Sequence, residues 1–185
     1  MLTKLRSLLI FSVLLAGPAA ADLVIDVEGV AQPTPVAVVP FGWEGQGQAM
    51  PLNVATVITA DLRRSGRFAP IAEDKMLQKP TDGVDVDFQD WSFVGVEAVV
   101  VGKLVQTDND RFTLQFQLFD VFGQRQLVGF RMPNVTRATM RGAAHRAADM
   151  IYEKLTGIKG VFGTRVAYVT AKQQGNGRIR IKGLP

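Results

Sequence analysis

The alternation of apolar and polar positions predicts strands interleaved with helices over most of the chain. Residues 36–39 are a short apolar run that is typical of a buried strand. A helix is expected after residue 50, because four apolar residues then recur three or four positions apart and would share one face: Val54, Val57, Ile58 and Leu62. Pro51 is acceptable in the first turn of this helix, Asn53 suits its N-cap and Gly66 suits its end.

Shorter elements are expected to follow the first helix. Residues 68–71 should return as an edge strand, because Pro70 cannot serve a central one. Residues 73–87 are polar and acidic and are expected to form a surface loop. A short helix over residues 88–93 would place Trp91 on the core.

The middle of the chain predicts a meander of three strands. Residues 98–105 are nearly all apolar, as in a central strand. Residues 111–118 alternate strictly, with an inward set, Phe112, Leu114, Phe116 and Leu118, and an outward set, Arg111, Thr113, Gln115 and Gln117. Residues 126–132 would form the third strand. The polar face of this hairpin predicts that helices cover only one of its sides.

A second long helix is expected over residues 139–155, ending at Gly157. Its apolar side would consist of Ala143, Ala147, Met150, Ile151 and Leu155. The predicted fold class is therefore α/β, a mixed sheet with two main helices over residues 36–160. Strands at 165–170 and 178–182, joined by a turn at 173–177, indicate the start of a second, all-β domain over residues 161–185, which is expected to be incomplete here.

The first 21 residues are expected to be a signal peptide. Lys4 and Arg6 give a basic start, residues 7–16 form an apolar run, and residues 19–21 match the small-residue pattern that precedes cleavage. The apolar run is shorter than the ~20 residues that a membrane-spanning helix needs. No other stretch is long and apolar enough to cross a membrane, so the mature chain is expected to begin at Asp22.

The first mature residues predict a detached amphipathic strand. Leu23, Ile25 and Val27 would share one face, and the other face would carry Asp22, Val24, Asp26 and Glu28, with Gly29 and Val30 completing the segment. Pro33 and Pro35 favour an extended linker after this strand, so residues 22–35 are expected to be poorly coupled to the body. Such a strand can pair with its own sheet edge or with an edge on another protein, and the pattern leaves both open.

Charge is distributed unevenly along the chain. Residues 22–123 hold 7 basic and 15 acidic residues, whereas residues 124–185 hold 12 basic and 2 acidic ones. Such asymmetry can indicate nucleic-acid binding, but an exported protein rarely meets nucleic acid. A polarised surface that faces protein partners is the favoured interpretation.

Few residues are suited to catalysis or to metal binding. The absence of cysteine excludes disulfides and thiolate chemistry. His145, the only histidine, has Arg141, Arg146 and Asp149 nearby in sequence but no nucleophile, which favours a surface or helix-packing role. Four acidic residues lack the spacing of a calcium loop and are expected to be solvated: Asp82, Asp85, Asp87 and Asp90. Neither enzymatic activity nor a cofactor is expected.

The glycine-rich stretch Gly42–Gly47 supports an alternative function. A glycine loop between a strand and a helix can bind phosphate at the helix N-terminus, so a small-ligand or nucleotide-binding α/β domain is possible in principle. The spacing matches neither the dinucleotide fingerprint nor a P-loop. This alternative therefore stands second to a protein-interaction module.

Several segments resemble the TolB family of the Tol–Pal system. The most specific is residues 153–160, Glu-Lys-Leu-Thr-Gly-Ile-Lys-Gly, continued by residues 164–168. Residues 38–41, 61–68 and 99–102 and Trp91 support it, in the family's order.

The resemblance implies an α/β N-terminal domain followed by a six-bladed β-propeller, of which residues 161–185 would be the first strands. It also implies that a mobile N-terminal strand contacts TolA. In this sequence the strand is Asp22, Leu23, Val24, Ile25, Asp26, Val27, Glu28, Gly29 and Val30. Pal would bind the propeller. The implied function is periplasmic and non-catalytic, in outer-membrane integrity and in envelope constriction during cell division.

Overall fold

The computed structural model describes residues 32–47, 49–164, 169–173 and 179–183. The expected signal peptide and the expected strand Asp22–Val30 lie outside these residues. Within the described part of the chain, no helix combines the length and the hydropathy that crossing a lipid bilayer requires.

A six-stranded mixed sheet forms the centre of the fold. Its strand order is β3-β1-β4-β5-β6, with β2 also pairing with β4. The strands are β1 (Thr34–Val38), β2 (Gly42–Glu44), β3 (Phe68–Pro70), β4 (Ala98–Asp108), β5 (Arg111–Asp120) and β6 (Arg125–Val135). β1 runs parallel to β3 and β4, and β4, β5 and β6 form an antiparallel meander. The predicted α/β fold with a mixed sheet is confirmed, and β3 is an edge strand as Pro70 predicted.

The glycine-rich stretch differs from the expected loop between a strand and a helix. Residues Gly42–Glu44 form the short strand β2, which pairs in parallel with Lys103, Leu104 and Val105 of β4. β1 pairs with β4 only between Ala98 and Val100. The same edge of β4 is therefore free of β1 beyond Val100. β2 occupies that remaining edge.

Helix α2 (Val54–Arg64) begins and ends where side-chain chemistry favours it. The Oδ1 atom of Asn53 accepts a hydrogen bond of 3.0 Å from the backbone N–H of Thr56, which satisfies a first-turn donor. Gly66 follows the C-cap with a φ of 70°, a left-handed conformation that glycine adopts without strain. The expectation for Pro51 was wrong, because Pro51 precedes the cap and lies outside the helix.

Helix α4 (Met140–Thr156) ends at Gly157 as predicted, with a φ of 72° at that glycine. Its buried side is broader than the predicted stripe, because α4 packs against α2 as well as against the sheet. The fully buried positions are Met140, Ala144, Ala147, Ala148 and Ile151. The expected Ala143, Met150 and Leu155 are only partly buried.

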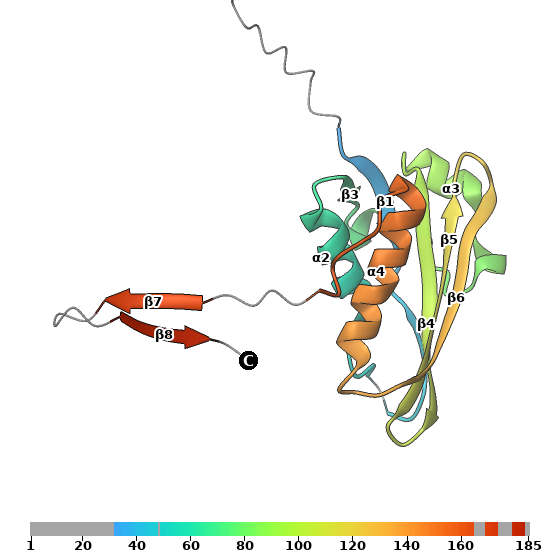
Figure 1. Cartoon of the computed structure of the whole chain (residues 1–185). Coiled ribbons are helices and arrows are strands. Elements are labelled where there is room, and N and C mark those ends of the chain that lie inside the picture. The colour runs from blue at the N-terminus through green and yellow to red at the C-terminus, as the bar shows by residue number, and fades with distance from the viewer. Residues whose placement is uncertain (1–31, 48, 165–168, 174–178, 184–185) are drawn as a thin grey trace, which may run out of the picture. The chain divides into compact units, whose positions relative to one another are not determined.

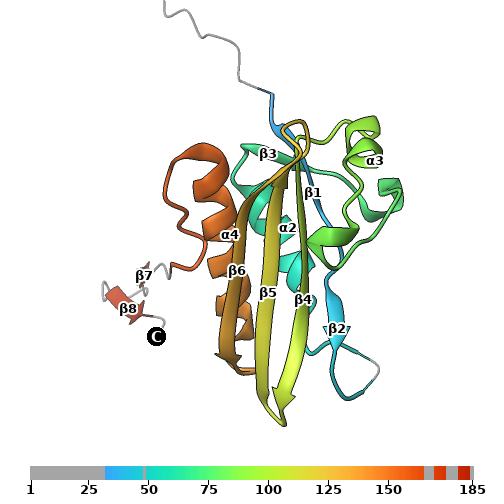
Figure 2. The ribbon, with the colours of Figure 1, turned by 90° about the vertical axis from the view of Figure 1, so that its right-hand side faces the viewer.

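Helices lie on both faces of the sheet, with α2 and α4 on one face and α3 (Phe88–Phe93) on the other (Figures 1 and 2). A large apolar cluster lies under α2 and α4. A smaller one surrounds Trp91 of α3, which is buried as predicted. The prediction that helices cover only one side of the central hairpin was therefore wrong in part. The smaller cluster includes Phe119 at the end of β5 and Val121 just beyond it, because residues 73–96 fold over that end of the second face.

Thr113 also departs from the prediction, since it is 2% exposed although it belongs to the outward set. In the register of β5 with β6, Phe112 pairs with Val135 and Leu114 with Met132. Thr113 thus lies opposite two residues of a bulge in β6.

The last described elements are β7 (Val169–Gln173) and β8 (Ile179–Gly183), which pair as an antiparallel hairpin. This confirms a hairpin in the region predicted, with its described first strand reaching Gln173, beyond the predicted end at residue 170. Residues 165–168, where that strand was expected to begin, lie outside the described residues.

Candidate functional site

The predicted partner-binding strand, Asp22–Val30, lies outside the described residues, so the structure does not test the placement of its side chains. The described chain begins at Gln32, and the backbone N–H of Thr34 donates to the carbonyl of Arg67 over 2.9 Å. β1 begins at Thr34, so Pro35 belongs to the sheet and the expectation that residues 22–35 form a poorly coupled segment was wrong at its last two residues.

The glycine loop that suggested phosphate binding is occupied by the protein's own groups. The indole Nε1 of Trp43 donates to the carbonyl of Gly47 over 3.2 Å. The backbone N–H of Gln46 donates to the side chain of Gln106 over 2.8 Å. A methyl group built at Gly45 would lie 2.3 Å from the Trp43 ring. With the N–H of Thr56 engaged by Asn53, these contacts occupy three of the donors that a phosphate in this region would use.

The acidic residues of 82–90 do not gather into a site. Among the residues that the structure describes, no group of three or more His, Cys, Asp or Glu side chains is placed to hold a metal ion. Asp82 lies 3.8 Å from Lys103, and Asp87 caps α3 by accepting from the N–H of Gln89 over 2.9 Å. Each acts locally.

Asp61 and His145 form the most buried polar contact between α2 and α4. The carboxylate of Asp61 is 1% exposed, and its Oδ2 atom lies 2.6 Å from Nδ1 of His145, whose side chain is 21% exposed. A carboxylate can only accept, so Nδ1 carries the hydrogen. The other oxygen lies 3.5 Å from the guanidinium of Arg64.

This contact confirms the helix-packing role predicted for His145. The residues near it in sequence are not its hydrogen-bond partner. Its partner is 84 positions away in the sequence rather than among Arg141, Arg146 and Asp149. The sequence does contain a signal for Asp61, which follows Ile58 by three positions and so falls on the apolar face of α2. Among the described residues no hydroxyl is hydrogen-bonded to His145, so the pair lacks the nucleophile that a catalytic triad requires.

Two polar contacts on the sheet, each with a carboxylate, shift the pKa of one of their members. A hydrogen bond from Lys103 to Glu44, and the charge of Glu44, raise the pKa of the Lys103 ammonium. The backbone N–H of Gly123 donates to Asp120 over 2.9 Å and lowers the pKa of that carboxyl group, with a further contribution from Arg125. Both contacts fix the ends of strands rather than form a reactive centre.

A groove of about 610 Å³ runs between β6 and the first turns of α4. One wall is the strand from Phe130 to Val135, and the other includes Ala138, Gly142 and Arg146. The groove was not anticipated from the sequence, because it depends on how far apart the strand and the helix come to lie. The open edge of β6 borders the groove on one side, and Arg146 of α4 borders it on the other.

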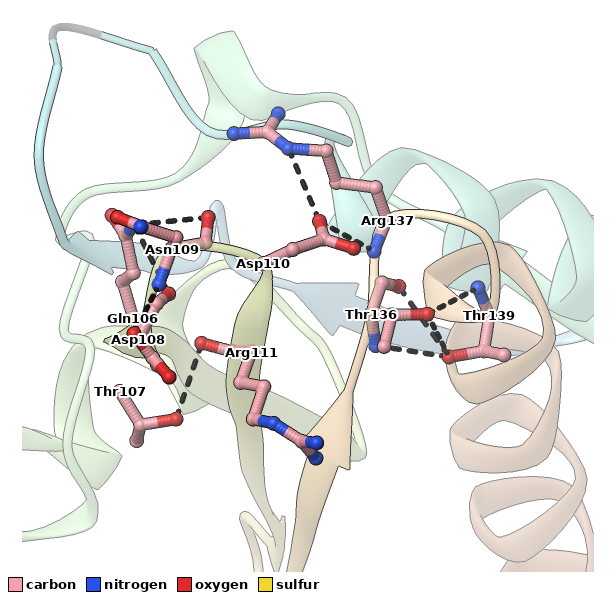
Figure 3. Close-up of polar contacts among 9 residues, drawn as sticks. All are labelled: Gln106, Thr107, Asp108, Asn109, Asp110, Arg111, Thr136, Arg137 and Thr139. Atoms are coloured by element: carbon pink, nitrogen blue, oxygen red, sulfur yellow. Dashed lines mark hydrogen bonds and ion pairs between the residues drawn. The ribbon is translucent and has the colours of Figure 1, made fainter.

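Where this strand and helix meet is shown in Figure 3. Arg137 contacts Asp110 of the β4–β5 turn through its guanidinium at 3.3 Å and its backbone N–H at 3.4 Å. Thr136 and Thr139 exchange hydrogen bonds just before α4 begins. These contacts hold the connection between β6 and α4 in place beside the groove.

The fold and these surfaces define a mixed α/β domain whose accessible features are grooves and strand edges. A family model described as the TolB amino-terminal domain matches residues 23–127, and the chain belongs to this family.

The chain is similar to proteins named Tol-Pal system protein TolB. That of Thioalkalivibrio sulfidiphilus is 46% identical over 172 residues, which are 92% of this chain and 39% of that protein. That of Nitrosococcus oceani is 45% identical over 158 residues, 85% of this chain and 36% of that protein. The crystal structure of TolB from Acinetobacter baumannii superposes with a TM-score of 0.63 at 34% identity, over 75% of this chain and 32% of that one. The chain thus spans about two fifths of the length of these curated relatives.

Proposed function

We propose that the chain is the periplasmic protein-interaction component of a Tol–Pal system, and that it binds TolA through Asp22–Val30. The observation that carries this proposal is membership of the TolB amino-terminal family over residues 23–127. In this role it would help maintain the outer membrane and constrict the envelope during cell division.

The proposed contact is a strand added to a sheet of TolA. Backbone hydrogen bonds would provide much of the affinity, and alternate side chains would fill partner pockets. Leu23, Ile25 and Val27 supply that apolar face, and the residues before β1, which begins at Thr34, would connect the strand to the body. The α/β body would act as the mount for this strand.

The proposed role is non-catalytic. The Asp61–His145 pair joins two helices, and its histidine has no hydroxyl partner among the described residues. We assign Pal binding to the propeller that the family resemblance implies rather than to residues 22–160. Export would depend on residues 1–21 as a signal peptide.

The test is deletion of Asp22–Val30 from the mature chain, followed by calorimetric titration with TolA. The deleted chain should keep its melting temperature and lose TolA binding. A sharper pair of variants keeps the length constant: Ile25→Asp changes the apolar face, and Asp26→Asn changes the opposite face. Ile25→Asp should weaken binding by about tenfold or more, an effect typical of an interface anchor, and Asp26→Asn by much less. Undiminished binding by the deleted chain would reject the proposal.

A further inference from the structure

Strand β6 leaves one edge of the sheet open. It is the last strand in the order β3-β1-β4-β5-β6, so only β5 pairs with it among the described strands. Its register with β5 shifts near Leu127 and again near Pro133, and it is regular from Val128 to Met132. Bulges and proline on edge strands limit unwanted pairing. They leave a window of regular backbone at residues 128–132.

The groove beside this window has room for side chains. Phe130 faces the same side of the sheet as Phe116, with ring centroids 6.3 Å apart, and is 42% exposed. The opposite wall on α4 is built of small residues, including Ala138, Gly142 and Ala143. A methyl group built at Gly142 meets no atom within 4 Å. An incoming apolar side chain could therefore pack on Phe130 without displacing the helix.

The rim of the groove is basic. Arg146 of α4 and Arg131 of β6 line it, and no acidic residue does. Arg131 pairs with Gln115 and so projects from the face opposite to Phe130, whereas Arg146 lies on the α4 side. Both arginines are exposed, and within the described part of the chain neither forms a salt bridge. The edge at β6 therefore combines an open backbone, an apolar surface on the α4 side and an exposed arginine on each face of the sheet.

We propose that this groove is a docking site for an extended acidic segment of a partner protein, which adds to β6 as a strand at residues 128–132. The segment's backbone pairs with the open edge, and its apolar residues pack on Phe130 and over Gly142. Because side chains alternate along a strand, its acidic residues lie on the other face of the sheet, beside Arg131. This site is separate from Asp22–Val30, so it goes beyond the TolA contact proposed above.

Charge favours such a partner over a second copy of this chain. Two copies paired along β6 would bring both pairs of Arg131 and Arg146 to one interface, and like charges across an interface oppose association. An acidic segment neutralises the same charges.

The test measures the binding of a short alternating peptide, acetyl-(Val-Asp)4-amide, to the protein. The peptide carries a fluorescent label, and binding is followed by fluorescence anisotropy. Binding should weaken by about tenfold or more with Gly142→Leu, which fills the groove. Leucine has a higher helix propensity than glycine, so this variant should remain folded, as circular dichroism can verify. Gly142→Ala should have a smaller effect.

The charge contribution has its own matched control on α4. Arg131→Glu should weaken peptide binding about fivefold or more at physiological ionic strength, because Arg131 lies on the face that the aspartates of the peptide occupy. Arg141→Glu makes the same change of charge at an exposed arginine outside the groove, and screening over about 8 Å should keep its effect below about twofold.

Three outcomes would overturn the proposal. The first is equal loss with Arg141→Glu and Arg131→Glu, which would indicate general attraction to a basic protein. The second is equal binding of the lysine counterpart, acetyl-(Val-Lys)4-amide. The third is dimerisation in analytical ultracentrifugation that Gly142→Leu abolishes, which would make the groove an interface between copies. Since none of these variants alters Asp22–Val30, TolA binding should stay unchanged, and the two proposals can fail separately.

Discussion

At the scale of single residues, the contact between Asp61 and His145 has the clearest energetic consequence. A buried carboxylate loses its hydration and becomes very unfavourable when it loses its partner. Asp61 is 1% exposed, whereas His145 is 21% exposed and can reach water. The two residues should therefore respond differently to loss of the other.

We expect His145→Ala to lower the free energy of unfolding by about 2–3 kcal/mol, because it leaves the Asp61 carboxylate buried with only the more distant Arg64. Asp61→Ala should cost less, since the histidine that remains is partly solvated. Urea denaturation of both single variants and the double variant gives the coupling energy between them. Additive losses would show that the pair does not stabilise the packing of α2 on α4.

Asp120 provides a prediction about pH. The hydrogen bond from Gly123 lowers the pKa of this carboxyl group in the folded state, so its stabilising contribution is present above the unfolded pKa of about 4 and is lost as the pH falls through the lowered folded value. Asp120→Ala should reduce stability by about 1 kcal/mol near pH 7, a typical net value for a hydrogen bond, because the partly exposed carboxylate is screened by solvent. Urea unfolding at pH 6 and pH 3 should show the difference between variant and wild type narrowing at the lower pH. A difference that widens in acid would contradict the assignment.

At the scale of elements, the sequence predicts what local chemistry decides. Asn53, Gly66 and Gly157 mark helix ends through their own side chains or backbone freedom, and all three do so in the structure. The strand β2 was missed because its pairing depends on an edge of β4, some 60 residues further along. The partner of His145 was missed because Asp61 is also distant in sequence, 84 positions away.

The N-cap of α2 can be tested directly. Asn53→Ala removes the acceptor for the N–H of Thr56 and should lower stability by about 1 kcal/mol. Asn53→Asp keeps an acceptor at the same position and should remain within a few tenths of a kcal/mol of wild type or exceed it, since an anion is also favoured at a helix N-terminus. Thermal or urea unfolding of the two variants separates loss of the cap from any change at the site. Equal losses would show that the hydrogen bond contributes nothing.

At the scale of the whole molecule, the two apolar clusters hold together the α/β body. This body carries the groove beside β6 and would also carry the proposed TolA-binding strand. All the described side chains of both clusters lie between Val36 and Phe162. The phenolic ring of Tyr152 on α4 packs edge-on against Phe162, with centroids 5.5 Å apart, and against Phe68 of β3 at 5.9 Å. The segment after α4 is thereby drawn onto the same core. Folding and partner binding should therefore be separable.

A chain restricted to residues 32–164 tests that separation. It keeps every described member of both clusters, so it should unfold in one cooperative transition, with a melting temperature within a few degrees of that of residues 22–185. It should also retain the binding of the acidic peptide at β6 while losing the proposed TolA contact. If it unfolds broadly or binds 8-anilinonaphthalene sulfonate as an expanded state does, then residues outside 32–164 belong to the core. The body could not then be treated as a rigid mount whose stability is independent of its N-terminal strand.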